Sequence, residues 1–240
     1  MLFRSDDKVL FLLSNFDEDN YETKFKEQMV IAKKYGITLQ PITFDLLINT
    51  IEFECKNLDS SFKQTISEFR KFLEVENLLA KWKHTLDVVN SGKTIEEINL
   101  GYYACPDTGG QYSHNRTKFL GPYGNKSVDK IYLIRAVVTI EMGGEKASVK
   151  WNNTDVKNHL LEAEAMEKLR NAPFEWRRNE VFQTDMQIFL LADPYPTSFR
   201  KSSSGGMFGS KKYFYLPNDL LTPEQVADYL KGKTWEQDLI

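Results

Sequence analysis

Cysteine and histidine are scarce in this chain. Of its 240 residues, two are cysteine, Cys55 and Cys105, and three are histidine. The cysteines form no Cys-x-x-Cys pair, and the histidines lie far apart in the sequence. The sequence therefore predicts no metal site, no cofactor and no disulfide framework. Two reduced thiols are typical of a cytoplasmic protein.

Long hydrophobic runs are also missing. The longest, such as VLFLL and IFLLA, have about five residues, whereas about 20 are needed to cross a bilayer. The first residues, MLFRSDDKVLFLL, carry charges where a signal peptide has its apolar region. We therefore expect a cytoplasmic protein without a membrane partner. A hydrophobic content of 41% still suffices for packed cores.

The sequence lacks the glycine motifs that bind nucleotide phosphates in the common nucleotide-binding folds. It contains no G-x-x-x-x-G-K-[ST] stretch, and no G-x-G-x-x-G opens a predicted helix. It has no nucleophile elbow either. No catalytic residue is indicated, and the sequence leaves open whether the protein is an enzyme.

Charge is unevenly distributed along the chain. Residues 1–100 carry 13 Lys and Arg against 17 Asp and Glu, whereas residues 101–214 carry 16 against 12. The last 26 residues are acidic again, with two cations and five anions. A basic middle in a mildly acidic protein indicates an anionic partner.

The first part of the chain, residues 1–95, has an α/β and helical pattern. A strand at 8–14, a helix ending before Gly36 and a strand at 37–44 predict one strand-helix-strand unit. Apolar residues from Phe62 to Leu86 recur near the 3.6-residue period, which predicts long amphipathic helices. We place a boundary at 95/96.

Residues 96–240 are richer in strand signals. The run from Lys130 to Met142 is the strongest, and Val181–Leu191 predicts another strand. A helix is predicted at 155–171, and a capping pattern at Thr222–Gln225 predicts a helix start. We therefore predict an α+β protein in which a small, partly closed, mixed or antiparallel β-barrel-like domain with one or two packed helices follows the N-terminal part.

Two basic loops in this second part stand out as candidate binding sites. Glycines allow the backbone to approach an anion, serine hydroxyls and backbone N–H groups donate to it, and Lys and Arg supply charge. Aromatic rings next to such cations can stack on unpaired bases. The candidate phosphate-binding and stacking residues are Tyr112, Arg116, Lys118, Tyr123 and Lys126 in the first loop, and Arg200, Lys201, Ser202, Ser203, Gly205, Gly206, Lys211 and Lys212 in the second.

Other interpretations of these segments stay open. The SSSGGMFG stretch is also typical of a flexible hairpin tip that lysines keep soluble. The acids Asp17, Asp19, Glu22 and Asp107 suggest a Mg²⁺-dependent nuclease, which needs carboxylates that converge on the metal. The same run near Asp17 is typical of residues that cap the following helix.

Residues 8–50 resemble the closing half of a PD-(D/E)XK nuclease domain. The strand KVLFLL, the helix ETKFKEQMVIAKKYG and the strand TLQPITF occur in that family's order, and Gln28 matches the glutamine of its helix. The strand here reads FLLSNF and has no E-x-K. The resemblance therefore implies a truncated or inactive nuclease-like domain.

Residues 100–216 resemble barrels of the PUA and EVE type. FLGPYGNKSVDKIYLIRAVVTIEM is similar to their lysine-bearing loop and following strand, and TSFRKSSSGGMFGSKKYFYL is similar to a returning hairpin. Such domains bind RNA or modified bases in DNA, and many occur in prokaryotic restriction and anti-phage systems. The resemblance implies a nucleic-acid partner.

The first hypothesis is thus a nucleic-acid-binding protein that cradles phosphates, as part of a prokaryotic restriction or anti-phage system. Three alternatives remain: a Mg²⁺-dependent or degenerate nuclease subunit, a sensor of a small nucleotide signal, and an adaptor or inhibitor with a protein partner. The sequence does not separate DNA, RNA and small nucleotides as ligands.

Overall fold

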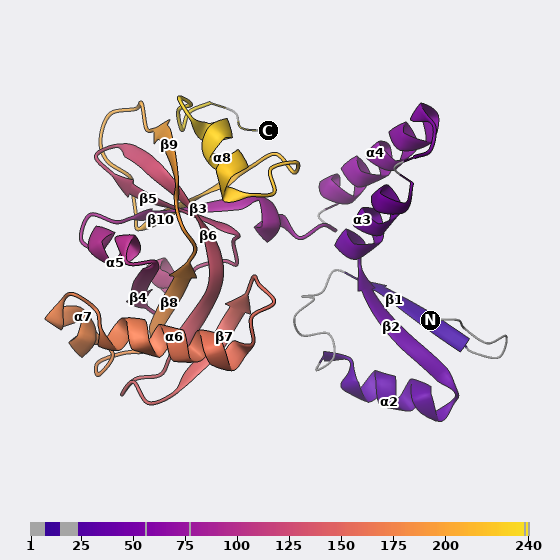
Figure 1. Cartoon of the computed structure of the whole chain (residues 1–240), viewed down its shortest axis with the longest axis horizontal. Helices are drawn as coiled ribbons and strands as arrows, with labels where there is room; N and C mark the ends of the chain where they lie inside the picture. Colours follow the sequence, from indigo (N-terminus) through magenta and orange to yellow (C-terminus); the bar gives the residue numbers. More distant parts are fainter. Residues whose placement is uncertain (1–7, 15–23, 56, 77, 238, 240) are drawn as a thin grey trace. The chain divides into compact units, whose positions relative to one another are not determined.

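The chain folds into two compact units, residues 1–80 and 81–240. The computed structural model describes residues 8–14, 24–55, 57–76, 78–237 and 239. Helices and strands are mixed in both units (Figure 1), which confirms the predicted α+β class.

The division between the units lies before the predicted boundary at 95/96. β3 (Thr85–Asn90) pairs in parallel with β5 (Phe119–Gly124) and antiparallel with β10 (Lys211–Tyr215), so it belongs to the second unit. The prediction that helical structure runs through Leu86 is wrong. The β-branched residues of TLDVVN and the burial of its first five positions explain why this segment is an interior strand.

The first unit contains the predicted strand-helix-strand arrangement. β1 (Lys8–Ser14) and β2 (Ile37–Thr43) are parallel, and α2 (Lys26–Lys34) lies between them in the chain. Thr43 then caps α3 (Phe44–Glu54), because its hydroxyl accepts a hydrogen bond from the Leu46 N–H. α3 packs on α4 (Ser60–Val75) through a small core that includes Ile48, Ile66, Leu73 and Leu79.

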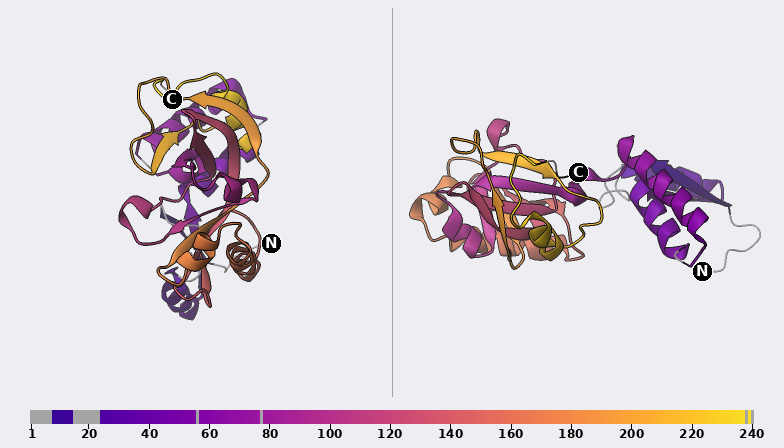
Figure 2. Two further views of the ribbon diagram at one scale, coloured as in Figure 1. Left: turned by 90° about the vertical axis from the view of Figure 1, so that its left-hand side faces the viewer. Right: turned by 90° about the horizontal axis from the view of Figure 1, so that it is seen from above.

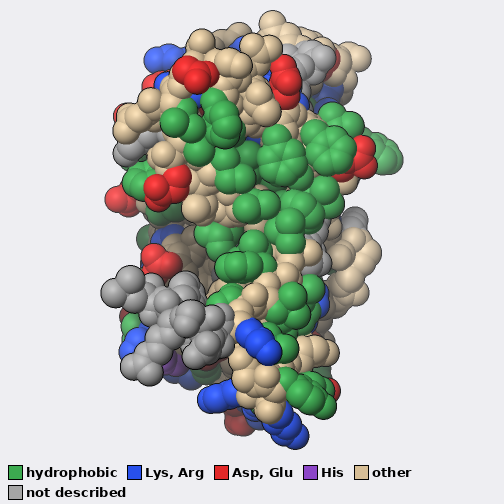
Figure 3. All heavy atoms as spheres, turned by 90° about the vertical axis from the view of Figure 1, so that its right-hand side faces the viewer, with side chains coloured by type: hydrophobic (Ala, Val, Ile, Leu, Met, Phe, Trp, Pro, Cys, Tyr) green, Lys and Arg blue, Asp and Glu red, His purple; other side chains and the backbone are tan. Residues whose placement is uncertain are grey.

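Much apolar surface of the first unit is exposed. On β1, the adjacent residues Leu10 and Phe11 point to opposite faces, and their exposed fractions are 56% and 61%. Phe53, Phe72 and Val75 of the two helices are also exposed. Figure 3 shows hydrophobic side chains gathered in a band on this unit. The densely buried core of the protein lies in the second unit.

The second unit is built around β6 (Ser127–Ile140), a strand of 14 residues. The first half of β6 pairs with β5 and with β9 (Tyr195–Arg200), and its second half pairs with β7 (Ala147–Asn152) and β8 (Met186–Leu191). The sheet runs in the order β10-β3-β5-β6-β8-β4, where β4 is Tyr102–Pro106. It does not plainly close into a barrel, because β10 and β4 end this path.

Helices cover the sheet at separate places (Figures 1 and 2). α6 (Asn158–Arg170) packs Leu161, Ala165 and Leu169 against β4, β6 and β8. α8 (Pro223–Leu230) packs against β6 and β9 and begins with the predicted capping box at Thr222. Two short helices, α5 (Ile95–Asn99) and α7 (Glu175–Glu180), complete the unit. The predicted strand at 181–191 begins only at Met186, because a turn follows α7.

A buried ion pair joins α5 and α7. Arg177 donates from Nε to Glu97 Oε1 at 2.8 Å, and both side chains are at most 3% exposed. Arg177 also donates to Glu180. Burial raises the pKa of Glu97 above its ordinary value, although the hydrogen bond and charge of Arg177 act in the opposite direction. Arg177 therefore compensates for the cost of burying the Glu97 carboxylate.

We predict that Arg177→Met lowers the free energy of unfolding by about 3–5 kcal/mol, because Glu97 loses its buried partner. The loss should be larger at pH 8 than at pH 5, since the folded variant must protonate Glu97 and this becomes harder as pH rises. Urea denaturation at the two pH values measures the loss in free energy of unfolding and its pH dependence. Arg135→Met is the matched control: the Arg135–Glu164 pair is about 30% exposed on both sides, and its loss should cost below about 1 kcal/mol. Equal losses in the two variants contradict the prediction.

Candidate phosphate-binding site

The second predicted basic loop joins β9 to β10. Gly205 and Gly209 have φ values of 79° and 86°, which other residues rarely adopt, so the loop depends on glycine there. Met207 packs against the core of the unit and anchors the loop. Its neighbour Phe208 is fully exposed, with an exposed fraction of 102%.

The first turn of this loop already holds an anion, the carboxylate of Glu236. The Ser202 N–H and hydroxyl donate to Glu236 Oε2 at 3.1 and 2.6 Å, and the Ser203 N–H donates to Oε1 at 3.1 Å. Both carboxylate oxygens are therefore bound. We call the three donors of Ser202 and Ser203 the serine nest. Convergent backbone N–H groups of this kind bind carboxylate and phosphate oxygens alike.

Lys201 stabilises the loop that carries the serine nest. Its ammonium group donates to the hydroxyl of Ser203 at 2.5 Å and to the carbonyl oxygens of Ser203 and Ser204 at 3.3 and 3.2 Å. Its own backbone N–H donates to the Lys126 carbonyl at 2.9 Å. The structure thus places Lys126 of the first basic loop next to Lys201 of the second.

Three segments lie side by side at this point. Ser127 is paired with Arg200 between β6 and β9, and Arg200 exchanges backbone hydrogen bonds with Lys233 and Trp235. We call residues 124–127, 200–204 and 233–236 the basic corner. It carries four cations, Lys126, Arg200, Lys201 and Lys233, against the single carboxylate of Glu236.

The turn at the start of β6 holds Lys126 in an unusual conformation. Asn125 and Lys126 have φ values of 50° and 62° and connect β5 to β6 as a two-residue hairpin turn. Such a turn favours Gly at its second position, because a side chain there costs about 1–2 kcal/mol. The chain has a lysine instead. The positive charge of Lys126 is thus carried by a strained residue in an exposed turn.

The structure places Arg116 and Lys118 elsewhere. They precede β5, whereas Lys126 follows it, and a six-residue strand spans about 20 Å. The Arg116 guanidinium lies 3.9 Å from the centre of the Trp82 ring and donates to Asn153 Oδ1 and the Asn152 carbonyl. The two predicted basic loops therefore meet at Lys126 and Lys201 but not at Arg116.

The Lys118 side chain forms a hydrogen bond within the second unit. Its ammonium group donates to the Leu221 carbonyl at 2.8 Å. Burial lowers the pKa of Lys118, and the charge of Lys83 lowers it further. Lys118 is thus a half-buried cation that helps fix the segment before α8.

The predicted stacking role of Tyr123 is wrong, because its ring is 6% exposed and packs 4.9 Å from that of Trp235. Tyr112 is partly buried against the core around Phe189. In the second loop, Lys212 lies over the Phe214 and Trp235 rings at 4.8 and 5.4 Å, and Lys211 belongs to β10. Gly205, Gly206 and the serines Ser202 and Ser203 lie in the exposed loop.

Sequence reasoning missed Phe208, Lys233 and Glu236. Phe208 lies in the GGMFG stretch. A large apolar residue among glycines is the sequence pattern that could have indicated an exposed binding residue. No local pattern links Glu236 to Ser202, because 34 residues separate them.

Of the acids proposed for a nuclease site, only Asp107 lies in the part of the chain that the structure describes. Asp17, Asp19 and Glu22 lie outside the described residues. Asp107 receives hydrogen bonds from Lys150 and from Thr139. Within the described ranges, no three His, Cys, Asp or Glu side chains are grouped as metal ligands.

A buried Asp-His-Cys arrangement lies in the interior of the sheet. His114 Nδ1 is 2.5 Å from Asp87 Oδ2, and His114 Nε2 is 3.9 Å from Cys105 Sγ. Such an order of groups can activate a thiol. All three residues are at most 5% exposed, however, and burial raises the pKa of Cys105 to about 12. The arrangement is a buried polar contact without access for a substrate.

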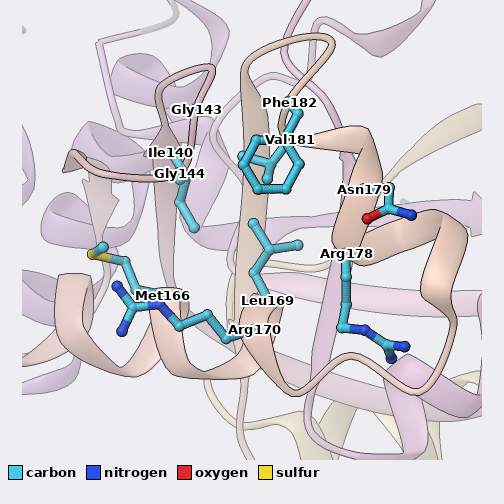
Figure 4. Close-up of a pocket in the computed structure, with 10 residues that line it drawn as sticks. All are labelled: Ile140, Gly143, Gly144, Met166, Leu169, Arg170, Arg178, Asn179, Val181 and Phe182. Carbon is cyan, nitrogen blue, oxygen red and sulfur yellow. The ribbon is translucent and has the colours of Figure 1, made fainter.

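A pocket of about 300 Å³ lies beside α6 and α7. Figure 4 shows apolar residues, including Leu169 and Val181, at its centre. The guanidinium groups of Arg170 and Arg178 point away from each other, and Arg178 donates to the Ala172 carbonyl. These two cations therefore do not converge on one anion.

No protein-family model, curated protein or solved structure matches this chain. The resemblances to PUA and EVE barrels and to PD-(D/E)XK nucleases stay predictions. Every helix of the described residues is too short or too polar to span a bilayer.

We predict that the two cysteines differ sharply in reactivity. Cys55 is half-buried, whereas Cys105 is 3% exposed and its raised pKa leaves little thiolate. Titration of the native protein with a thiol reagent at pH 8 should detect Cys55 alone, and denaturant should reveal the second thiol. A Cys55→Ser variant should show no rapidly reacting thiol when native. Rapid reaction of Cys105 in that variant contradicts the assigned burial.

Proposed function

We propose that the protein binds nucleic acid, with the basic corner as the surface that holds phosphates. The observation that carries this proposal is the serine nest: two backbone N–H groups and a hydroxyl bind one anionic group on the surface. This is the chemistry by which loops hold phosphate oxygens. The resemblance to PUA and EVE barrels agrees with such a ligand.

The charges of the basic corner support the proposal. Lys126 and Arg200 are exposed and stand on neighbouring backbone segments. Exposed cations on neighbouring segments attract a phosphate backbone, and its counterions are released on binding. Lys233 adds a further positive charge within the same corner.

Phe208 supports single-stranded rather than duplex ligands. The Phe208 ring is fully exposed, so its π-face is available for an unpaired base. Met207 fixes the backbone next to it. The loop therefore presents an anchored stacking platform close in sequence to the serine nest.

Lys126 provides an independent argument. Strained backbone persists where another requirement outweighs the strain, and such residues cluster at functional sites. A glycine at this turn position would relieve the strain but would remove the charge. Phosphate binding supplies a reason to keep a lysine there.

We predict that the protein binds single-stranded oligonucleotides and that affinity falls roughly 20-fold between 50 and 200 mM salt, as for about three phosphate contacts. A Lys126→Ala, Arg200→Ala double variant should bind more weakly and lose only roughly threefold over that range. Fluorescence polarisation measures both. The control pair Lys146→Ala, Lys157→Ala removes two exposed charges elsewhere and should behave like wild type. Absence of binding at 50 mM salt overturns the proposal.

We also predict that Lys126→Gly separates stability from binding. Glycine adopts the required φ without strain, so the free energy of unfolding should rise by about 0.5–1 kcal/mol, while oligonucleotide affinity falls. Lys126→Ala should lose the same affinity without the gain in stability. Urea denaturation and polarisation provide the two readouts. A glycine variant that binds as well as wild type shows that this lysine does not contact the ligand.

A further inference from the structure

The serine nest of the free protein is filled by the chain's own carboxylate. Glu236 is exposed to solvent, yet both of its oxygens accept hydrogen bonds from Ser202 and Ser203. These hydrogen bonds, above all those of Ser202, hold the pKa of Glu236 far below its usual range. Any phosphate that uses these donors must therefore replace an ionised carboxylate.

The backbone around Glu236 is fixed, so only its side chain has to move. Trp235 is buried between Phe199, Phe214 and Tyr123. The Thr234 N–H donates to the Gln237 side chain at 2.9 Å. Since these contacts do not involve the Glu236 side chain, a change of its rotamer frees the nest while leaving the core intact.

Charge decides which phosphate can displace Glu236. A phosphodiester inside a strand carries one negative charge, as a carboxylate does, so exchanging one for the other gains little. A terminal phosphate carries about −1.5 to −2 at pH 7 and has three acceptor oxygens. It therefore gains more from the surrounding cations than Glu236 does.

We propose that the serine nest is a binding site for a terminal phosphate group and that Glu236 occupies this site until such a ligand displaces it. The inference rests on the proposed nucleic-acid binding and specifies its ligand as a phosphorylated end. A 5′-phosphorylated strand and a free mononucleotide carry the same group. For the strand, Phe208 and the remaining cations add contacts that a mononucleotide reaches only in part.

The binding test compares short single strands that differ only in a 5′-phosphate or a 5′-hydroxyl, with a mononucleotide as a third ligand. The wild type should prefer the phosphorylated strand, and this preference should grow from pH 5 to pH 7.5 because the second ionisation of phosphate lies near pH 6. If the mononucleotide binds as tightly as the strand, the source is a free nucleotide. Equal affinity for the two strands at both pH values overturns the inference.

Glu236→Ala should tighten binding of the 5′-phosphorylated strand by at least about threefold, because the nest no longer has a competing occupant. The 5′-hydroxyl strand should change little. Glu145→Ala, which removes an exposed charge elsewhere, controls for the long-range effect of net charge. Equal tightening of both strands means that Glu236 acts only through net charge, which contradicts displacement.

A direct observation of the nest does not depend on a variant. On titration of the labelled full chain with inorganic phosphate, the amide resonances of Ser202 and Ser203 should shift in wild type and shift at lower phosphate concentration in Glu236→Ala. Unshifted Ser202 and Ser203 amides in both proteins overturn the terminal-phosphate site. If oligonucleotides still bind with the predicted salt dependence, nucleic-acid binding stands, but through the cations of the basic corner and Phe208 rather than through the nest. If no oligonucleotide binds, the proposed function fails as well.

Discussion

The second unit depends on the backbone hydrogen bonds of β6. This one strand pairs with β5 and β9 along its first half and with β7 and β8 along its second. A strand with four partners is buried through most of its length, which explains why the segment from Ile131 to Ile140 is apolar except at Arg135 and Thr139. Three cores form on it: one under α8, one under α6, and a third that includes Tyr132, Ile134 and Val137.

The same strand creates the basic corner. Because β6 begins beside the end of β9, the turn that carries Lys126 lies against Arg200 and Lys201, and the segment around Trp235 pairs with Arg200 from the other side. The corner is thus a consequence of the sheet's register rather than of a flexible loop alone. The residues proposed to bind phosphate lie next to Phe199 and Trp235 in the sequence. Because these two side chains are buried, they fix the backbone of the corner.

Sequence patterns predicted the elements whose signals are local. The strand-helix-strand order of 8–44, the long strand near 130–142 and the capping box at Thr222 are in the structure. Leu86 fits a helical period, and only the pairing of β3 with β5 and with β10 reveals it as a strand residue. The Tyr123 ring, which the sequence predicts as exposed, packs on Trp235 because the sheet brings these two distant residues together. Glu236 in the serine nest is a long-range contact that no local pattern encodes.

Cross-linking tests the central claim, that the basic corner holds the nucleic acid, most directly. A single strand carrying a photoreactive base is irradiated with the full chain, and the cross-linked peptides are identified by mass spectrometry after trypsin digestion. The account predicts cross-links in the peptide Ser202–Lys211, which contains Phe208. Cross-links confined to peptides that contain Trp82 or Arg116, beyond the other end of β5, contradict it.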